Sequence, residues 1–474
     1  MRRLLLGAGV GLVAVHVAVL AYHLALTVAF PFDLDYGEGY VLNDAVRLAR
    51  GEAIYVDLQQ FPMVRSPYPP LYPLVWSWLV PLTGPSFWPG RLLSSLALLG
   101  LGGLAAWNAW RVGAGRWPLL LAPGLIAASP FVYQWAGYAR VDLLALLLAA
   151  GGVLTAQWVR GWRGVLGAAM LCGLAMWTKQ TTATAAIAVA LALFARGWRP
   201  AVLFVLTVAA PSAVAVLALD RATGGEFSQH VLLGNASNPF SAPRSLVYVT
   251  IFGALHLPVL AGSLWWVRKT LRGVPSPVAL YVPVSLLVAF SAGNEGSSVN
   301  YLLEPIVACA LAFPFVWRAL PSPATLGAPV LACVQLAVLL HWPNAFGTDY
   351  LRVAPHGRTP TADDYAIGQA VDAAVRAEPG AVIAEPAGFS LRNDRPVYLQ
   401  PIDLRAEQLK GRWQSGPLIE ALSAGQFRLL VTAYNLLPAD VERAVGRQFV
   451  RIDELAGADG LTFGLYRYAP CSGC

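Results

Sequence analysis

The chain has 474 residues, of which 57% are hydrophobic and only 12% are charged. Soluble globular proteins carry about 25% charged residues, so this composition excludes a wholly soluble protein and indicates a polytopic membrane protein. The net charge of +7 comes from residues 1–342, where 20 basic residues face 11 acidic ones, whereas residues 343–474 hold 13 basic and 15 acidic residues. The basic excess therefore reports membrane topology and gives no sign of a nucleic-acid partner.

Eleven apolar segments are long enough, or nearly so, to cross a bilayer, which takes about 20 residues. They lie at 4–30, 92–110, 118–134, 141–159, 164–178, 181–195, 200–219, 246–267, 275–292, 301–317 and 323–341. The segments 164–178 and 181–195 are short, and they could be two tight spans or one long broken helix. Residues 1–342 are expected to form an α-helical polytopic membrane domain of about 11 transmembrane helices.

The loop that follows the first segment, residues 31–90, is expected to carry interfacial helices. Residues 38–50 have the apolar face of a surface helix. Residues 68–83 contain four prolines and two tryptophans, which suit a helix lying in the interface better than a span. A span at 68–83 would also place the later charges on the wrong sides of the membrane.

The charges between the segments predict the orientation of the chain. With a cytoplasmic N-terminus, the cytoplasmic turns receive most of the Arg and Lys residues, and all acids of the membrane domain face the other side. Eleven spans then leave the C-terminal region extracytoplasmic. We therefore expect a multi-pass protein of the cell inner (plasma) membrane with its candidate chemistry on the extracytoplasmic face.

From residue 343 the composition changes to that of a small α/β domain, residues 343–474. Short strands are expected at 381–384, 396–399, 428–432 and 463–467, with helices at 363–377, 416–424 and 437–447. This domain has no glycine-rich phosphate loop and no nucleophile motif. Its position predicts a cap that shapes the access of an acceptor, and the alternative is a module that only adds stability.

Acidic residues are concentrated in the first outer loop, which holds six of the eleven acids of residues 1–342. Asp33, Asp35 and Glu38 fall in one short stretch beside two glycines. Carboxylates at a membrane face are costly to keep without a use. They could take a proton from an acceptor hydroxyl, hold a divalent cation such as Mg or Mn, or both. The alternative is a solvated loop whose acids only keep it outside.

Basic and polar residues on the same side complete the candidate site. Arg140 and Asp142 lie at a helix mouth, and Lys179 lies between two short apolar runs. Basic residues that face carboxylates could bind a lipid phosphate next to a catalytic acid or base. Each basic residue alone could instead flank a transmembrane helix and extend its charge to the lipid headgroups. Arg65 is a further candidate for the phosphate, and the candidates for the substrate are Asp142, Glu295, Asn300, Glu304 and His230.

The order of these motifs resembles a known superfamily. It runs from Asp35-Tyr-Gly-Glu38-Gly-Tyr40 through Tyr68-Pro-Pro-Leu-Tyr72 and Arg91-Leu-Leu-Ser-Ser to Tyr138-Ala-Arg140-Val-Asp142 and Thr178-Lys179-Gln180. Over residues 1–340 this pattern resembles the polytopic GT-C glycosyltransferases, in the branch of protein O-mannosyltransferases and aminoarabinose transferases. The resemblance implies an enzyme that transfers a sugar, with inversion, from a polyprenyl-phosphate donor to an acceptor hydroxyl of a lipid, glycan or protein on the extracytoplasmic face.

The resemblance also implies roles for individual residues. A carboxylate of the first outer loop acts as the base, and Asp35 matches it best, with Asp33 as second candidate and Glu38 as a second acid. Arg140 and Lys179 match the residues that stabilise the departing lipid phosphate. Many relatives place a Glu directly after the Asp, whereas this chain has Tyr there and its acid at Glu38. This departure leaves open which acid is the base and whether Asp35 and Glu38 hold a metal.

Two other classes of protein fit the same composition. A transporter or flippase of polyprenyl-linked glycans would favour charges near the middle of the membrane and similar halves, neither of which the sequence has. A non-catalytic assembly subunit would use its acids for topology alone.

Overall fold

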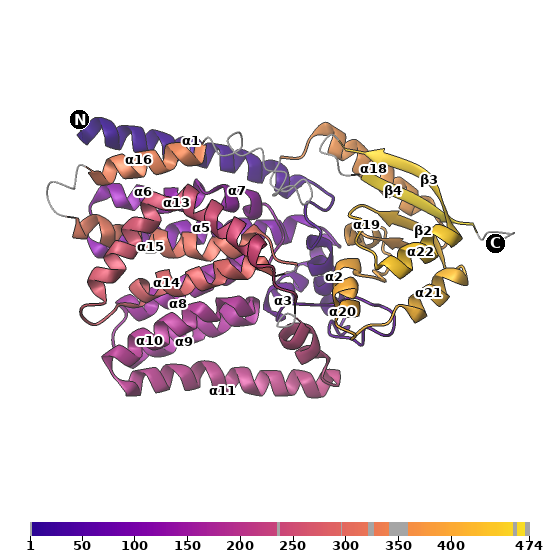
Figure 1. The fold of residues 1–474 in the computed structure, drawn as a ribbon, viewed down its shortest axis with the longest axis horizontal. Coiled ribbons are helices and arrows are strands. Elements are labelled where there is room, and N and C mark those ends of the chain that lie inside the picture. Colours follow the sequence, from indigo (N-terminus) through magenta and orange to yellow (C-terminus); the bar gives the residue numbers. More distant parts are fainter. Residues whose placement is uncertain are drawn as a thin grey trace.

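The computed structural model describes the chain except for residues 1, 235–237, 295, 321–326, 341–358, 458–461 and 470–474. The domain boundary expected at residues 342 and 343 lies outside the described residues. Figure 1 shows a helical bundle with the N-terminus at its far end, and a small sheet domain at the other end. The loop that follows the first helix passes between these two parts.

The bundle is built from helices that coincide with the expected apolar segments. They are α1 (Arg2–Ala29), α5 (Trp88–Val112), α6 (Arg116–Ala127), α7 (Pro130–Ala136), α8 (Asp142–Trp158), α9 (Gly161–Thr178), α10 (Ala183–Arg196), α11 (Trp198–Thr223), α13 (Ala242–Thr270), α14 (Pro277–Phe290), α15 (Leu303–Ala319) and α16 (Gly327–Leu340). The expected segment 118–134 is the pair α6 and α7, which is bent by 64°. The α-helical polytopic fold class is therefore confirmed.

Length separates the helices of the bundle into two groups. Among the described residues, five helical stretches are each long and apolar enough to cross a membrane, and the bent pair is a sixth candidate. The helices α8, α10 and α14 are apolar but shorter, so a total of eleven crossings stays a prediction. The helices α9 and α10 are separate and pack against each other, which rules out one long broken helix for residues 164–195.

Small residues allow the closest helix packing in the bundle, between α8 and α9. A Cβ atom at Gly152 would lie 2.6 Å from Sγ of Cys172 and 3.2 Å from the carbonyl oxygen of Ala168. Small side chains let helix backbones approach closely, which is how membrane helices gain van der Waals contact. α8 begins at Asp142, which is buried.

The first outer loop contains short helices that lie between the bundle and the C-terminal domain. α3 (Leu71–Ser77) and α4 (Val80–Thr83) are too short to cross a bilayer, as expected. α2 (Glu38–Ala49) was expected at the surface, and this prediction is wrong because Glu38 to Val46 are buried. The helix packs against α3 and against α19 (Ala387–Arg392) of the C-terminal domain.

The C-terminal domain has a four-stranded sheet with helices packed against it. Its strands β1 (Ala381–Ala384), β2 (Phe427–Thr432), β3 (Phe449–Ala456) and β4 (Thr462–Tyr468) have the order β1-β2-β4-β3. β1 and β2 are parallel, and the other pairs are antiparallel. Its helices, besides α19, are α18 (Ala362–Ala377), α20 (Pro401–Leu409), α21 (Gly416–Ser423) and α22 (Ala439–Gln448).

Two predictions for this domain fail for identifiable reasons. Residues 396–399 do not form a strand of the sheet, because Leu399 makes an isolated bridge to Met63 of the first outer loop. β3 was not expected, because it is an edge strand with mostly exposed, charged residues and lacks the apolar alternation of a half-buried strand. The bridge shows that the loop and the domain are joined through backbone hydrogen bonds.

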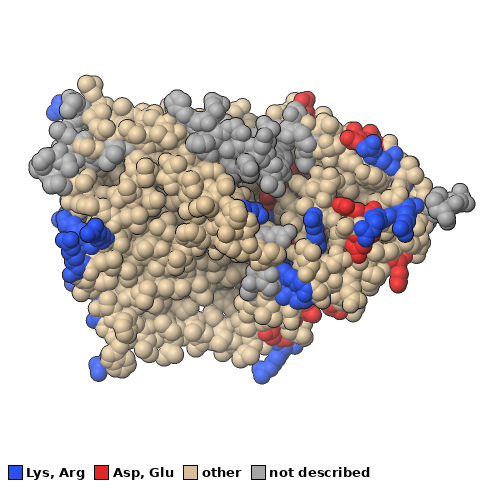
Figure 2. All heavy atoms as spheres, in the orientation of Figure 1, with Lys and Arg blue, Asp and Glu red and all other residues tan. Residues whose placement is uncertain are grey.

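The distribution of charge fits a protein that crosses a membrane. In Figure 2, Lys and Arg gather at the end of the bundle that lies away from the C-terminal domain. The visible side of the bundle is almost free of charge, and the C-terminal domain carries both signs. A belt without charge between two charged ends is what a multi-pass membrane protein presents to lipid.

Candidate functional site

Asp35 and Arg140 form an ion pair where the first outer loop meets the mouth of α8. Oδ2 of Asp35 lies 2.7 Å from Nη1 of Arg140 and accepts the backbone N–H of Gly37 at 3.0 Å. Nη2 of Arg140 donates to the hydroxyl of Tyr68 at 3.0 Å. The Nε–H of Arg140 is buried without a partner among the described residues. The pair thus combines a carboxylate with a cation that keeps one donor for a ligand.

Gly37 is required for this pair, since a Cβ atom there would lie 1.3 Å from Nη1 of Arg140. We predict that Gly37→Ala displaces the guanidinium and lowers the activity of this site at least about tenfold, because misplacing a group of a reactive site by about 1 Å costs that much or more. The control is Gly446→Ala, whose added methyl meets nothing within 4 Å. Equal activity of the two variants would show that the Asp35–Arg140 contact is dispensable.

Asp142 is the centre of a second set of contacts, which joins three parts of the bundle. Its Oδ1 accepts Nζ of Lys179 at 2.6 Å and Nδ2 of Asn300 at 2.9 Å. Its Oδ2 accepts Nε1 of Trp135 at 2.8 Å. The ammonium of Lys179 also lies 4.5 Å from the centre of the Tyr301 ring. Asp142 therefore orients the cation of Lys179 at the outer mouth of the helices.

Tyr68 links these two groups into one cluster of charges. Burial raises the pKa of Tyr68, Arg140 and Lys179 oppose this rise, and Asp142 adds to it. The three charges thus act on one hydroxyl. The structure brings together Asp35, Arg140, Asp142, Lys179 and Asn300, as a shared outer site requires. Tyr68 was not among the candidates, although it opens the quoted Tyr-Pro-Pro motif.

Glu38 lies apart from this cluster in a fully buried pair with Arg91. Its Oε1 and Oε2 accept Nε and Nη2 of Arg91 at 2.9 and 2.8 Å, and neither side chain is exposed. The same two oxygens accept the backbone N–H groups of Ala139 and Leu34 at 2.6 and 2.9 Å. The remaining donors of Arg91 bind backbone carbonyls at the end of α1. This geometry favours a structural role for Glu38.

A metal held by Asp35 and Glu38, which the sequence left open, does not fit these contacts. Both oxygens of Glu38 face N–H donors, and a cation placed there would meet the guanidinium of Arg91. The part of the chain that the structure describes also contains no group of three or more His, Cys, Asp or Glu that could hold a metal. We therefore assign no step of the reaction to a metal at these two residues.

Asp33 faces the C-terminal domain and not the cluster. Its Oδ1 accepts the N–H of Gly388 at 3.4 Å, and its Oδ2 is buried without a partner among the described residues. Burial and the charge of Glu38 raise the pKa of Asp33 to about 7, against the opposing effects of Gly388 and Arg91. Asp33 is therefore a poor match for a carboxylate that works beside Arg140.

This shift predicts a pH dependence of stability. Because the folded protein holds the proton of Asp33 more tightly than the unfolded chain, the stabilisation is present below about pH 4 and is lost as the pH rises through about 7. The melting temperature of Asp33→Asn minus that of the wild type should therefore be larger at pH 8 than at pH 5. The exposed Asp57→Asn serves as control. A difference in melting temperature that is the same at both pH values would contradict the assignment.

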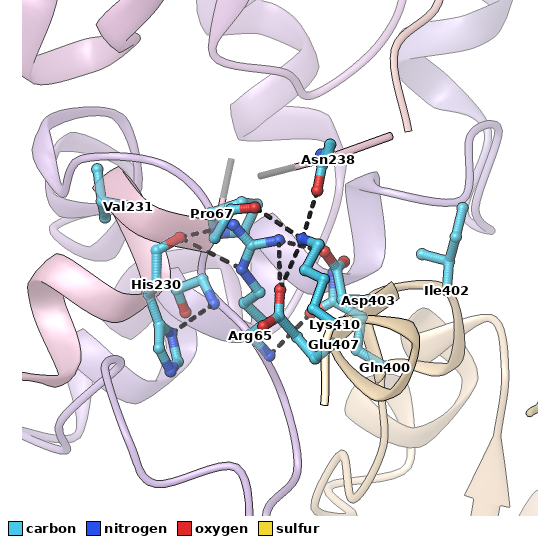
Figure 3. A network of polar contacts seen from close by, with 12 residues as sticks. Arg65, Pro67, His230, Val231, Asn238, Gln400, Ile402, Asp403, Glu407 and Lys410 are labelled. Atoms are coloured by element: carbon cyan, nitrogen blue, oxygen red, sulfur yellow. Dashed lines mark hydrogen bonds and ion pairs between the residues drawn. The ribbon is translucent and has the colours of Figure 1, made fainter. Parts of the chain in front are cut away.

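Arg65 and His230 belong to a separate network that fastens the first outer loop to the C-terminal domain (Figure 3). Nη1 of Arg65 lies 3.0 Å from Oδ1 of Asp403, and its Nε and Nη2 donate to the carbonyl of His230 at 3.2 and 2.7 Å. Nδ1 of His230 accepts the N–H of Ser66 at 3.1 Å, and burial lowers the pKa of the ring to about 4. Their contacts are structural, and they give no support to roles in phosphate or substrate binding.

The last two candidates lie near α15. Oε1 of Glu304, in the first turn of this helix, accepts the hydroxyl of Thr184 at 2.6 Å and is buried. The 3₁₀ turn before the helix carries Asn300, so both side chains come from one end of the bundle. Glu295 lies outside the described residues.

Comparison with known proteins identifies the fold. No protein-family model matches the sequence, and no curated protein matches it either. The crystal structure of ArnT from Cupriavidus metallidurans bound to undecaprenyl phosphate is similar, with a TM-score of 0.60 and 14% sequence identity. The match covers 97% of this chain and 98% of the ArnT chain. The chain therefore has the GT-C fold.

Two further structures with the GT-C fold agree. ArnT in the apo state matches with a TM-score of 0.58 and 14% identity, over 96% of this chain and 98% of that chain. The arabinofuranosyltransferase AftD from Mycobacteria matches with a TM-score of 0.50 and 16% identity, and covers 97% of this chain but 40% of its own. At these identities the likeness shows the fold alone, so the chemistry depends on this chain's own residues.

Proposed function

We propose that this protein is a glycosyltransferase that moves a sugar from a polyprenyl-phosphate donor to an acceptor hydroxyl. The observation that carries the proposal is the Asp35–Arg140 pair, with a separation of 2.7 Å, at the outer mouth of a GT-C bundle. The fold is shared with ArnT, which has been crystallised with undecaprenyl phosphate. This likeness supports the proposal that the basic residues of the site bind a lipid phosphate.

Arg140 and Lys179 would bind the phosphate of the donor. When the bond between the sugar and the phosphate breaks, the leaving phosphate gains negative charge, and fixed cations stabilise that state more than the ground state. The buried Nε–H of Arg140 supplies a donor without loss of the contact to Asp35. Asp142 holds the ammonium of Lys179 at 2.6 Å and so positions it.

Asp35 would act as the base. The acceptor oxygen attacks the anomeric carbon, its proton passes to a carboxylate oxygen of Asp35, and the bond from the carbon to the phosphate oxygen breaks on the opposite side. A single displacement of this kind inverts the anomeric configuration. The products are the glycosylated acceptor and the free polyprenyl phosphate. The contacts from Arg140 and Gly37 hold the carboxylate in place for this step.

The reaction would take place on the extracytoplasmic face of the plasma membrane. Basic residues at the opposite end of the bundle support a cytoplasmic location for that end (Figure 2). The C-terminal domain lies on the side of Asp35 and contacts the first outer loop through the bridge between Met63 and Leu399. We infer that this domain is an extracytoplasmic cap over the site.

The experiment uses purified protein in proteoliposomes with radiolabelled polyprenyl-phosphate sugars and crude membrane acceptors. We expect at least one labelled sugar to appear in the acceptor fraction, with inverted anomeric configuration. Movement of labelled lipid across the bilayer without transfer of any sugar would contradict the proposal and would identify a transporter instead.

A further inference from the structure

A cavity lies between the first outer loop and the C-terminal domain, apart from the Asp35–Arg140 pair. Its volume is about 50 Å³, and it is lined by residues that include Asp33 and Tyr434 and by four phenylalanines, Phe30, Phe32, Phe389 and Phe463. A water molecule needs about 10–15 Å³ on this measure, so the cavity has room for roughly four heavy atoms. Phe30, Phe32 and Asp33 come from the segment that directly follows α1, and the C-terminal domain supplies Phe389, Tyr434 and Phe463.

Asp33 gives this cavity an acceptor that the protein does not satisfy. Its Oδ2 is buried and has no hydrogen-bond partner among the described residues. Two glycines crowd the same carboxylate: Cβ atoms at Gly39 and Gly388 would lie 2.4 Å from Oδ1 and 2.2 Å from Oδ2. A buried carboxylate oxygen without a donor destabilises the fold, because its hydration is lost without replacement. A ligand that donates a hydrogen bond would restore it.

Tyr434 connects the cavity to the proposed active site. Its backbone N–H and those of Ala433 and Leu436 donate to the carboxylate of Glu385 at 2.6–3.1 Å, which fixes the loop after β2. Burial raises the pKa of Tyr434, and the charges of Asp33 and Asp35 add to this rise. Tyr434 lines the cavity together with Asp33, and its ring packs against the ring of Tyr36, the neighbour of Asp35, with the ring centres 5.3 Å apart.

The lining has the chemistry that recognises carbohydrate. A sugar presents C–H groups that pack on aromatic rings and hydroxyl groups that donate to a carboxylate. The phenylalanine rings and Asp33 offer these two kinds of contact in one place. The volume suits one edge of a sugar ring and excludes a whole ring, so the rest of the molecule would lie outside the cavity.

We propose that this cavity is the acceptor subsite and that it takes a hydroxyl-bearing edge of a carbohydrate, with Asp33 accepting a hydrogen bond from a hydroxyl group. The inference rests on the proposed function and narrows its acceptor to a glycan or the glycan part of a lipid. The acceptor hydroxyl that reacts would be presented toward Asp35, past Tyr434.

The first experiment measures binding without a donor. Saturation-transfer NMR on the full-length protein in nanodiscs at pH 8 would use the methyl glycosides of glucose, galactose, mannose and arabinose. We expect at least one to bind, and Asp33→Asn to weaken its binding about tenfold, the cost of one hydrogen bond to a charged acceptor. Phe463→Leu, which removes a ring, should also weaken binding. The exposed Glu420→Gln on the same domain should bind as the wild type does.

Folding does not obscure this test, since Asp33→Asn removes an unsatisfied carboxylate and keeps its shape. Binding of the glycosides that is unchanged by both Asp33→Asn and Phe463→Leu would overturn the proposal. If the protein binds none of the glycosides but transfers sugar to a non-carbohydrate acceptor, the subsite proposal is overturned and the proposed function stands. Binding that depends on Asp33 without transfer from any donor would keep the subsite and reject the proposed function. Extraction of labelled product into organic solvent then separates a glycolipid acceptor from a free glycan.

Discussion

Asp35→Asn is expected to lower the rate of sugar transfer by about 10²–10⁴-fold, the usual contribution of a general base. The amide oxygen can still accept the N–H of Gly37, which now lies 3.0 Å from the carboxylate, so the loop keeps its shape. The amide cannot take the proton of the acceptor. The rate is measured with saturating polyprenyl-phosphate sugar and membrane acceptor, beside the melting temperature of the detergent-solubilised protein.

The matched control for Asp35→Asn is Asp57→Asn, an exposed acid of the same loop. The control should transfer sugar as the wild type does, and both variants should bind undecaprenyl phosphate. An Asp35→Asn protein that is folded and retains more than a third of the wild-type rate would remove Asp35 as the base.

The second large effect is on folding. Glu38→Gln and Arg91→Met should each lower the free energy of unfolding by about 3–5 kcal/mol, because each leaves one buried charge without its partner. Neither side chain of the pair has any exposed surface, and Arg91 also binds the carbonyls of Thr27 and Phe32. The yield of folded protein and its melting temperature measure the loss.

The double variant Glu38→Gln with Arg91→Met separates a structural pair from a catalytic acid. Removing both charges should cost less than the sum of the single changes, because no charge is left unpaired. A folded, stable Glu38→Gln protein without transfer activity would instead assign Glu38 to the reaction. Effects on stability that simply add would show that the two side chains do not depend on each other.

The long apolar segments of the sequence predicted the helices of the bundle well, because each long helix must present apolar side chains to lipid or to its neighbours. The sign of charge between the segments likewise placed Asp35, Arg140, Asp142 and Lys179 on one side. Their side chains do meet in the structure, through contacts of 2.6–2.7 Å. Segment order and charge were sufficient for this result.

The partners of the other charged residues could not be read from the sequence. Glu38 and Arg91 are 53 residues apart, and Arg65 meets Asp403 across 338 residues. Such pairs depend on how the first outer loop folds against the bundle, which supplies Arg91, and against the C-terminal domain, which supplies Asp403, and no local pattern records this. The burial of α2 has the same origin, because α19 of the distant domain covers it. β3 escaped prediction since an exposed edge strand needs no apolar alternation.

Sugar transfer from a polyprenyl-phosphate donor is tested most directly by following the donor lipid. Purified protein is incubated with a panel of undecaprenyl-phosphate sugars and membrane acceptor, and free undecaprenyl phosphate is quantified by mass spectrometry against the sugar gained by the acceptor. We expect the two amounts to rise together in the wild type and neither to rise in Asp35→Asn. Donor lipids that bind but all remain intact would contradict it.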